Sequence, residues 1–314
     1  MKNEKKIFIT GVNGFIGRNL CKFLINKKFI VYGIDNFFSS DRNDLKELKN
    51  PNFHFAEKSI LDDNIYDFVK DKIDVVIHLA AQTSVFKSLK DPYLNDLINI
   101  DGFENIFFQS KKLDIESFFF TSSSSVYGDN KNLPLGEDLK ELKPLSPYAE
   151  SKLKNENFFY KHKGSTNMVG LRLFNMYGIR NEKSSSNYAA VIPKWINNIK
   201  SDKPCQIYGD GKSLRDFCHI DDLCFFFLLL IKNHKRNGVF NFCSSKPCSI
   251  ETLFFKIVKI FYNLGYKVKY PKPDYVEAVK GDIKFSYGCN NLLKEIFNFE
   301  TKITLDKGLR QIIK

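Results

Sequence analysis

A tyrosine and a lysine four residues apart, Tyr148 and Lys152, are the residues of this sequence whose types and spacing best suit proton transfer. In a helix the two side chains lie on the same face, one turn apart. Ser146 can cap such a helix, and Pro147 suits its first turn. A neighbouring ammonium stabilises a phenolate, so we expect the pKa of Tyr148 to be lowered from its usual value of about 10. The pair is a candidate base for a sugar hydroxyl, although the spacing alone also fits an ordinary amphipathic helix.

A run of hydroxyl side chains precedes this pair by about one crossover connection. A strand predicted over Ser117–Ser122 continues directly into residues 123–128, which begin with three serines. The carboxyl ends of strands in an open α/β sheet face the ligand crevice, so a hydroxyl there can bond a substrate oxygen. A serine run is also common in a plain turn, but its place at the end of a buried strand favours a site shared with Tyr148.

The N-terminal segment indicates the fold that would position these residues. A short apolar strand, Lys6–Thr10, is followed by Gly11, Gly14 and Gly17 and then by a helical pattern. Strand, glycine turn and helix form the context of a dinucleotide-binding fingerprint. The first glycine permits the tight turn, the second lets the backbone approach a pyrophosphate, and the third allows close helix–strand packing.

An acidic residue ends the next predicted strand. Asp35 follows Phe29–Ile34, about 20 residues beyond the glycine turn, where a carboxylate can accept a hydrogen bond from a ribose 2′-hydroxyl. The same carboxylate would repel the 2′-phosphate of NADP. The sequence therefore favours NAD as the cofactor.

Strands and helices continue to alternate along the first half of the chain, which predicts a parallel, doubly wound Rossmann sheet of the α/β class. Beyond residue 180 glycine and proline interrupt the pattern, and we expect a smaller C-terminal substrate-binding lobe. The further strands are predicted at Asn52–Phe55, Val75–Leu79, Ser117–Ser122 and Asn167–Leu173, and the helices at Asp63–Asp71, Tyr93–Lys111 and Tyr148–Lys161.

Composition limits the possible environments of the protein. The chain has 314 residues and 43% hydrophobic residues, and its longest apolar run, Leu223–Ile231, is about half the length of a membrane span. The short apolar stretch after Lys6 argues against a signal peptide. Seven cysteines without a CxxC pair suggest buried thiols in a reducing compartment. We expect a cytoplasmic protein with no membrane partner.

The net charge of +12 raises the alternative of nucleic-acid binding. The basic residues are mostly lysines spread evenly along the chain, which is more typical of a compositional bias than of a binding stripe. We therefore expect no nucleic-acid partner. Arginine is scarce by comparison, so Arg215 merits a specific explanation.

Three motifs together identify the chain as resembling the extended short-chain dehydrogenase/reductase family. They are Gly11-x-x-Gly14-x-x-Gly17, Thr121-Ser-Ser-Ser-Ser-Val-Tyr-Gly128 and Tyr148-x-x-x-Lys152. Longer segments, including Leu171–Gly178 and Tyr208–Phe217, are similar to the NAD-dependent UDP-sugar 4-epimerases, above all those acting on UDP-N-acetylglucosamine. The resemblance covers essentially the whole chain.

The resemblance implies a role for each matching position. Tyr148 would be the acid/base, Lys152 would bind the nicotinamide ribose and tune Tyr148, and Ser123 would bond the sugar 4-oxygen. The cofactor NAD would contact Gly11, Gly14, Phe15, Ile16, Asp35, Asn36, Ile60, Leu79, Ala80, Ala81, Asn99, Tyr148 and Lys152. The substrate would contact Ser84, Ser123, Asn175, Ala190, Val191, Ile207, Tyr208, Arg215 and Ser286. A planar guanidinium at Arg215 also suits a diphosphate on physical grounds.

The resemblance further implies two domains and a reaction. Residues 1–174 would form the NAD-binding Rossmann domain, with a return of the chain at about 213–242, and 175–314 would mainly form the UDP-sugar-binding lobe. The reaction would be reversible epimerisation at C4 through a transient 4-keto sugar, with NAD tightly bound. Related dehydratases carry an Asp-Glu pair where this chain has Ser122 and Ser123, so elimination of water lacks its acid. A homodimer is also implied.

One position of the resemblance concerns the choice of sugar. Ser286 stands where the members restricted to glucose and galactose carry a bulky tyrosine, so there is room for a 2-acetamido group. We expect interconversion of UDP-GlcNAc and UDP-GalNAc. Val279 stands where the family usually has an arginine that contacts the diphosphate.

Three alternatives to this expectation remain. The substrate can instead be UDP-glucose or UDP-glucuronate, or the chain can be a non-catalytic NAD-sensing protein. The intact Tyr148, Lys152 and Ser123 argue against the last.

Acidic residues around His219 suggest a metal site, but their spacing fits no standard ligand motif, so we expect no metal.

Overall fold

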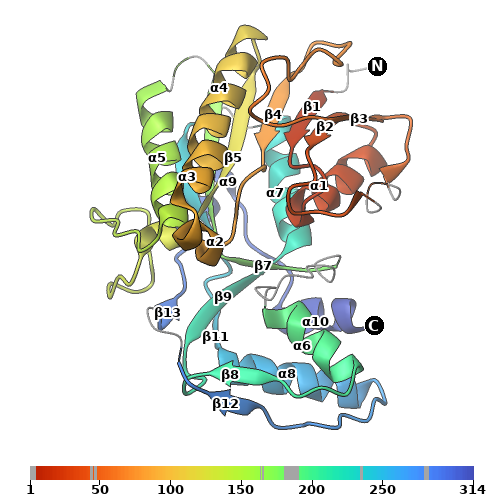
Figure 1. Cartoon of the computed structure of the whole chain (residues 1–314), viewed down its shortest axis with the longest axis vertical. Helices are drawn as coiled ribbons and strands as arrows, with labels where there is room; N and C mark the ends of the chain where they lie inside the picture. The colour runs from red at the N-terminus through yellow and green to blue at the C-terminus, as the bar shows by residue number, and fades with distance from the viewer. Residues whose placement is uncertain are drawn as a thin grey trace. The chain divides into compact units, whose positions relative to one another are not determined.

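Figure 1 shows a computed structural model of the chain. The structure describes residues 5–42, 45, 48–162, 164, 166–179, 191–233, 236–278 and 283–314. The described chain divides into two compact units, which are treated separately below. Unit 1 comprises residues 1–126, 144–172 and 224–240, and unit 2 comprises residues 127–143, 173–223 and 241–314.

Unit 1 is built on a seven-stranded sheet with the strand order β10-β6-β5-β4-β1-β2-β3. The pairs β1–β2, β2–β3, β1–β4 and β4–β5 are parallel. Consecutive strands therefore run outward in both directions from β1, which confirms the doubly wound α/β fold predicted from the sequence. The strands are β1 (Lys6–Thr10), β2 (Ile30–Asp35), β3 (Phe53–Glu57), β4 (Val75–His78), β5 (Ser117–Ser123), β6 (Asn167–Leu173) and β10 (Gly238–Phe242).

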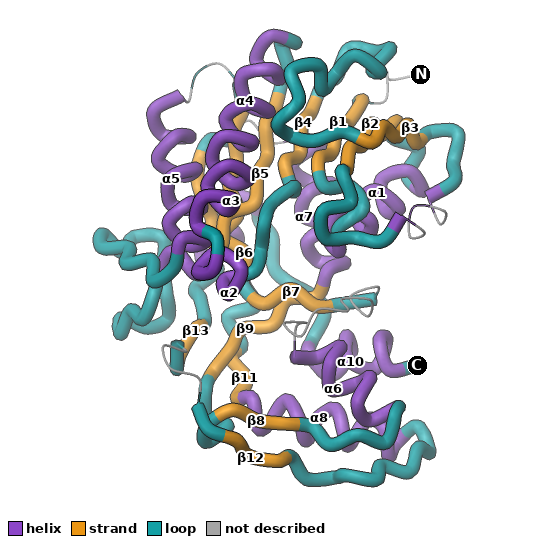
Figure 2. The backbone as a smooth tube through the Cα atoms, viewed as in Figure 1, coloured by secondary structure: helices purple, strands orange, loops and turns teal. Residues whose placement is uncertain are grey.

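The helices of unit 1 cover the two faces of this sheet. Figure 2 shows α4 and α5 side by side on one face, and their phenylalanines pack into one cluster with alternate residues of the strands, such as Phe8 and Phe118. On α1 and α7, Phe23 and Phe225 contact each other with ring centroids 5.0 Å apart. The helices are α1 (Phe15–Asn26), α2 (Val85–Lys90), α3 (Pro92–Asp96), α4 (Gly102–Lys112), α5 (Pro147–His162) and α7 (Ile220–Asn233).

The helix predicted over Asp63–Asp71 is wrong, because the structure has turns over residues 63–68. The backbone there makes i to i+3 bonds, such as Val69 N to Tyr66 O at 3.0 Å. The Gln109 side chain accepts a hydrogen bond from Ile65 N, and the Tyr66 hydroxyl bonds Ser110 Oγ at 2.6 Å. These contacts attach the segment to α4. The local spacing of apolar residues cannot reveal them.

The helix predicted over Tyr93–Lys111 is present but interrupted. A π-helical segment, Leu97–Asp101, separates α3 from α4. Within it the Asn99 carbonyl accepts a hydrogen bond from the Asn155 amide of α5 at 2.9 Å. Capture of a backbone carbonyl by a side chain of another helix is a recognised cause of such a local widening.

Unit 2 contains smaller sheets around its own hydrophobic core. In one sheet β11, β9 and β13 are adjacent and β7 pairs with β9, and in another β12 pairs with β8. Trp195, Phe254 and Leu309 are fully buried in the core of this unit. Its strands are β7 (Asn175–Tyr177), β8 (Gln206–Tyr208), β9 (Leu214–His219), β11 (Pro247–Ser249), β12 (Asp274–Val276) and β13 (Phe285–Ser286), and its helices are α6 (Val191–Lys200), α8 (Ile250–Asn263), α9 (Asn291–Phe297) and α10 (Leu305–Ile313).

Candidate active site

The Tyr148–Lys152 pair lies on the first turns of α5, as the sequence predicted. The Ser146 hydroxyl accepts a hydrogen bond from Ala149 N at 3.2 Å, and Pro147 is the first helical residue. Lys152 is almost fully buried, and its Nζ donates to the Thr121 carbonyl of β5 at 3.0 Å. The same Nζ lies 5.9 Å from the centre of the Tyr148 ring. The helix and the strand end thus bring a phenol and an ammonium together.

The expectation that the pKa of Tyr148 is lowered is wrong. Burial raises the pKa of Tyr148, and a hydrogen bond from the Ser123 hydroxyl opposes this rise. Burial also lowers the pKa of Lys152 to about 8, partly offset by the negative charge of Glu156. Desolvation therefore outweighs the attraction between phenolate and ammonium that the sequence argument considered.

Ser123 ends β5 beside Tyr148, and its neighbours direct its hydroxyl group. Ser123 Oγ accepts hydrogen bonds from Ser125 N at 3.1 Å and from Ser125 Oγ at 2.9 Å. With both lone pairs engaged, the Ser123 hydrogen is left to be donated to another oxygen. Sequence analysis named Ser123 but missed Ser125, because nothing in a run of serines shows which of them orients its neighbour.

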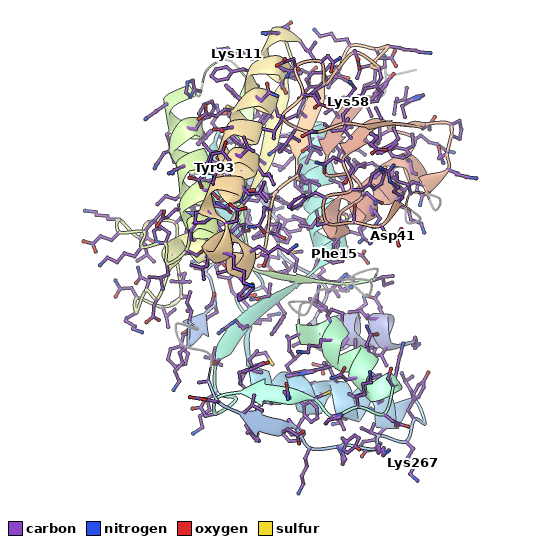
Figure 3. All side chains as sticks on the ribbon, viewed as in Figure 1. Phe15, Asp41, Lys58, Tyr93, Lys111 and Lys267 are labelled. Atoms are coloured by element: carbon purple, nitrogen blue, oxygen red, sulfur yellow. The ribbon has the colours of Figure 1, made fainter. Side chains whose placement is uncertain are left out.

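The glycine turn before α1 packs so closely against neighbouring backbone that a side chain would collide with it. A Cβ at Gly11, where φ is +67°, would lie 2.7 Å from Ala80 N, and a Cβ at Gly17 would lie 2.2 Å from Gly11 O. Gly14 caps α1 without a side-chain hydrogen bond, and the first turn, which begins at Phe15 and Ile16, carries no acidic residue. Figure 3 labels Phe15 at this helix start. Exposed N–H groups and the positive helix end fit a pyrophosphate, so these residues fit NAD.

Asp35 lies at the end of β2 next to this turn and is already bonded to the protein. Its carboxylate accepts hydrogen bonds from Asn13 N at 3.0 Å, Phe37 N at 2.8 Å and Ser40 Oγ at 3.3 Å. Burial raises the pKa of Asp35, and these hydrogen bonds oppose the rise. Asn36 is exposed and its side chain accepts from Phe38 N. The turn therefore holds the carboxylate in a fixed orientation.

The residues after β4 are held against the end of β1. Thr10 Oγ1 accepts from Leu79 N and Ala80 N, each at 3.1 Å, and Ala81 follows. The Thr10 hydroxyl also bonds His78 Nδ1 at 2.9 Å. Since Thr10 Oγ1 already accepts twice, the hydroxyl donates to Nδ1 and His78 is the Nε2–H tautomer. Burial and the Lys152 charge lower the pKa of His78 to about 3, which keeps the ring neutral.

Three other residues expected at the ligands have structural contacts of their own. Asn99, in the π-helical segment, donates to Gln82 O at 3.0 Å and to Ser151 Oγ at 3.2 Å, which joins the loop after β4 to α5. Ile60 is buried, and its carbonyl accepts from an asparagine of α4. Ser84 caps α2. Their contacts to NAD or to substrate remain predictions.

In unit 2 the structure brings three of the predicted substrate residues onto adjoining strands. Arg215 on β9 is the register partner of Ser286 on β13. Arg215 Nη1 donates to the Leu214 carbonyl at 3.0 Å and to the Lys284 carbonyl at 3.3 Å. Asn175 on β7 pairs with β9, and its amide donates to Asp216 O at 3.1 Å.

The residues predicted to contact uridine differ in exposure. Ile207 is fully buried in the core of unit 2, so only its backbone can meet a ligand. Tyr208 is half exposed, and Val191 begins α6, partly buried against the same core. Ala190 and Val279 lie outside the described residues.

The acidic residues near His219 are used within unit 2. Asp216 accepts hydrogen bonds from the backbone of Ser244 and Ser245, and Asp222 accepts from Lys302 N and Ile303 N. Among the residues that the structure describes, no group of three or more His, Cys, Asp or Glu side chains is placed to hold a metal ion. Within the same residues, no helix is both long and apolar enough to cross a bilayer.

The comparison with protein families decides the membership of this chain. The model of the NAD dependent epimerase/dehydratase family matches residues 7–243. The chain belongs to this family. The family is NAD dependent by its description, which agrees with the parallel sheet and glycine turn of unit 1.

Curated and solved relatives extend the similarity over the whole length. The chain is 31% identical to the UDP-glucuronate 4-epimerase of Thermodesulfobacterium geofontis, over 97% of this chain and 94% of the relative. It is 32% identical to the UDP-N-acetylglucosamine 4-epimerase of Methanobrevibacter ruminantium M1, solved with UDP-N-acetylmuramic acid, with a TM-score of 0.90 over 99% of this chain and 97% of the other. It is 29% identical to the UDP-glucuronic acid 4-epimerase of Bacillus cereus, solved with UDP-glucuronic acid and NAD, with a TM-score of 0.86 over 98% of each chain.

Proposed function

We propose that this protein is a UDP-sugar 4-epimerase that interconverts UDP-N-acetylhexosamines. The observation that carries the reaction type is the meeting of Tyr148, Ser123 and Lys152 at the junction of β5 and α5. A phenol, a hydroxyl donor and an ammonium at one place form a group suited to moving the proton of a sugar hydroxyl. All three similar proteins named above are 4-epimerases by name, which supports the same conclusion.

The chain's own residues perform the proton chemistry. Tyr148, as the phenolate, takes the proton of the C4 hydroxyl and later returns one to the 4-keto oxygen. Ser123, oriented by Ser125, donates a hydrogen bond to the same sugar oxygen. Lys152 supplies a positive charge that favours the phenolate and so opposes the rise of the Tyr148 pKa by burial.

The glycine turn, Asp35 and the Leu79–Ala81 segment would hold NAD. When bound, NAD supplies a hydride acceptor and donor at C4, so the sugar is oxidised and reduced again without net redox change. A cofactor that is regenerated in each cycle has no need to leave its site.

The choice of an N-acetyl sugar rests on position 286. Ser286 is small and partly buried, and it lies in register with Arg215, the candidate diphosphate residue. A sugar attached to a diphosphate at Arg215 would lie next to Ser286, where a short side chain leaves room for a 2-acetamido group. The similarity to a UDP-N-acetylglucosamine 4-epimerase supports this substrate.

The test is to incubate the purified protein with UDP-GlcNAc, UDP-GalNAc, UDP-glucose and UDP-glucuronate and to separate the products. We expect 4-epimers of the N-acetyl sugars, and Ser286→Tyr should abolish their turnover while sparing UDP-glucose. Ser286→Ala is the matched control, because it removes the hydroxyl without adding bulk. Equal loss of both activities in Ser286→Tyr would refute the assignment of Ser286.

UDP-glucuronate or UDP-glucose is the second candidate substrate. The identity of 31% to a UDP-glucuronate 4-epimerase over nearly the full length favours the former. Product formation from UDP-glucuronate alone would select it. A protein that retains NAD but epimerises no sugar of the panel would instead be the NAD-sensing alternative.

We further propose a homodimer and a cytoplasmic location. Phe108 on α4 and Tyr160 on α5 are large side chains that remain half exposed in the single chain, on helices that lie side by side. All seven cysteines are free thiols and six are buried, which suits a reducing compartment. Light scattering tests the dimer, and cell fractionation tests the location.

A further inference from the structure

A buried ion pair lies behind the candidate catalytic residues, one helical turn beyond Lys152. Glu156 is fully buried, and its carboxylate accepts two hydrogen bonds from Arg172, Nε to Oε1 at 3.0 Å and Nη2 to Oε2 at 2.7 Å. A bidentate arginine–carboxylate pair is geometrically specific. Burial of two charges is costly, so the pair is weak evidence for stability and invites a functional explanation.

The same carboxylate also contacts the strand that carries the candidate catalytic serine. Ser122 Oγ donates to Glu156 Oε1 at 2.5 Å. Ser122 lies between Thr121 and Ser123. The Thr121 carbonyl accepts the hydrogen bond from Lys152 Nζ. Glu156 therefore joins α5, β5 and, through Arg172, β6 at one point.

We infer that Glu156 is a positioning residue for the reaction, which holds the end of β5 against α5 and keeps the Lys152 side chain a cation. This inference rests on the proposed epimerase function, which it deepens by adding a residue that does not contact substrate. The spacing of four residues puts Glu156 and Lys152 on the same face of α5.

The charges around Lys152 come from several elements. Tyr148 and Glu156 belong to α5, His78 to β4 and Arg172 to β6. His78 is neutral, and Tyr148 is neutral unless it acts as a base, so Glu156 is the negative group that offsets burial of the ammonium. Without it, the effect of burial would be unopposed, and Lys152 would lose its proton at a lower pH.

Two measurements test the inference on the full-length protein. The first is the pH dependence of kcat with a saturating UDP-sugar. The second is the titration of the Lys152 Cε resonance by NMR of ¹³C-lysine-labelled protein, assigned by its absence in Lys152→Met. Wild-type protein should show an alkaline limb and a resonance step near the Lys152 pKa of about 8.

In Glu156→Gln both the limb and the step should move to lower pH by about one unit or more, the usual effect of removing an opposite charge nearby. Glu150→Gln is the matched control, because it removes an exposed carboxylate from the same helix, and it should leave both unchanged. Ser122→Ala keeps both charges of the pair and should lower kcat without moving the titration. An unmoved limb and step in folded Glu156→Gln would overturn the inference.

A double variant covers the case in which Glu156→Gln does not fold. Glu156→Met with Arg172→Met replaces the buried pair by apolar side chains, a change that proteins often tolerate. The double variant should fold and should titrate Lys152 below the wild-type pH, and a wild-type titration would refute the role of Glu156. If wild-type protein epimerised no UDP-sugar, the proposed function would fail, while the NMR titration would still decide whether Glu156 sustains the Lys152 charge.

Discussion

The candidate catalytic residues of unit 1 and the candidate substrate residues of unit 2 are held in place in different ways. In unit 1 the side chains bond one another and neighbouring carbonyls, as Lys152 does with Thr121 O and Ser125 with Ser123. In unit 2 the backbone register of β9 and β13 sets Arg215 beside Ser286, and the Arg215 side chain donates to the backbone carbonyls of Leu214 and Lys284. We therefore expect replacement of a side chain in unit 1 to disturb neighbouring side chains, and replacement of Arg215 or Ser286 to act mainly on the proposed substrate binding.

The largest effect should come from Tyr148→Phe. The variant removes the proposed acid/base but keeps the ring, so kcat should fall by on the order of 10²–10⁴-fold with the fold intact. Steady-state rates with UDP-GlcNAc measure this, and bound NAD, released by denaturation and quantified, is the control. A kcat within a few fold of wild type would remove Tyr148 from the chemistry.

Arg215→Leu should act on binding rather than on the chemical step. Loss of one charge-assisted contact to a diphosphate costs about 1.5–3 kcal/mol, so KM should rise roughly 10–100-fold while kcat changes little. Lys212→Leu, at an exposed position near β9, is the control and should change neither. A fall in kcat at constant KM would contradict the contrast between the units.

Acid should destabilise unit 1 through His78. The folded-state pKa of about 3 lies below the unfolded value of 6.5, so the unfolded chain takes up the proton first as pH falls. The contribution of neutral His78 is full above pH 6.5 and is lost towards pH 3, by at most about 1.4 kcal/mol per pH unit. In His78→Asn, whose amide oxygen can accept the Thr10 hydrogen bond, this loss should shrink.

Urea midpoints at pH 7 and pH 5 measure the acid effect. The exposed His54→Asn variant is the control and should keep the wild-type difference between the two pH values. If His78→Asn kept the wild-type difference between the urea midpoints at pH 7 and pH 5, then His78 would not be the source of the acid sensitivity of unit 1.

The smallest effect should come from Ser125→Ala. It removes the hydroxyl that bonds Ser123 Oγ but leaves the backbone bond from residue 125. A net hydrogen bond contributes about 0.5–1.5 kcal/mol, so kcat should fall roughly 2–10-fold. Ser124→Ala is the control, and a larger loss there than at Ser125 would reassign the orienting residue.

The fold could be predicted where the sequence pattern is local. Glycine spacing and strand–helix alternation were sufficient for the doubly wound α/β fold, because each signal lies within about 20 residues. The helix expected over Asp63–Asp71 is absent because hydrogen bonds to Gln109 and Ser110, some 40 residues away, hold that segment in turns. The break at Leu97–Asp101 likewise depends on Asn155 in a different helix.

The candidate site was predictable in its residue types but not in its electrostatics. Tyr148 and Lys152 could be named from a spacing of four, whereas the direction of the Tyr148 pKa depends on burial, which no spacing reveals. Glu156 has the same spacing from Lys152, yet its importance depends on Arg172 from β6 and Ser122 from β5. Such long-range partners appear only when the strands are placed next to each other.

The pairing of β13 with β9 has a consequence for the proposed choice of sugar. β13 is only two residues long, and its backbone is fixed by a neighbouring strand rather than by the side chain at position 286. That side chain can be exchanged without moving the strand or Arg215. Under the proposed role of Ser286, a single codon change at this place would alter the accepted sugar and leave the proposed diphosphate contact of Arg215 in place.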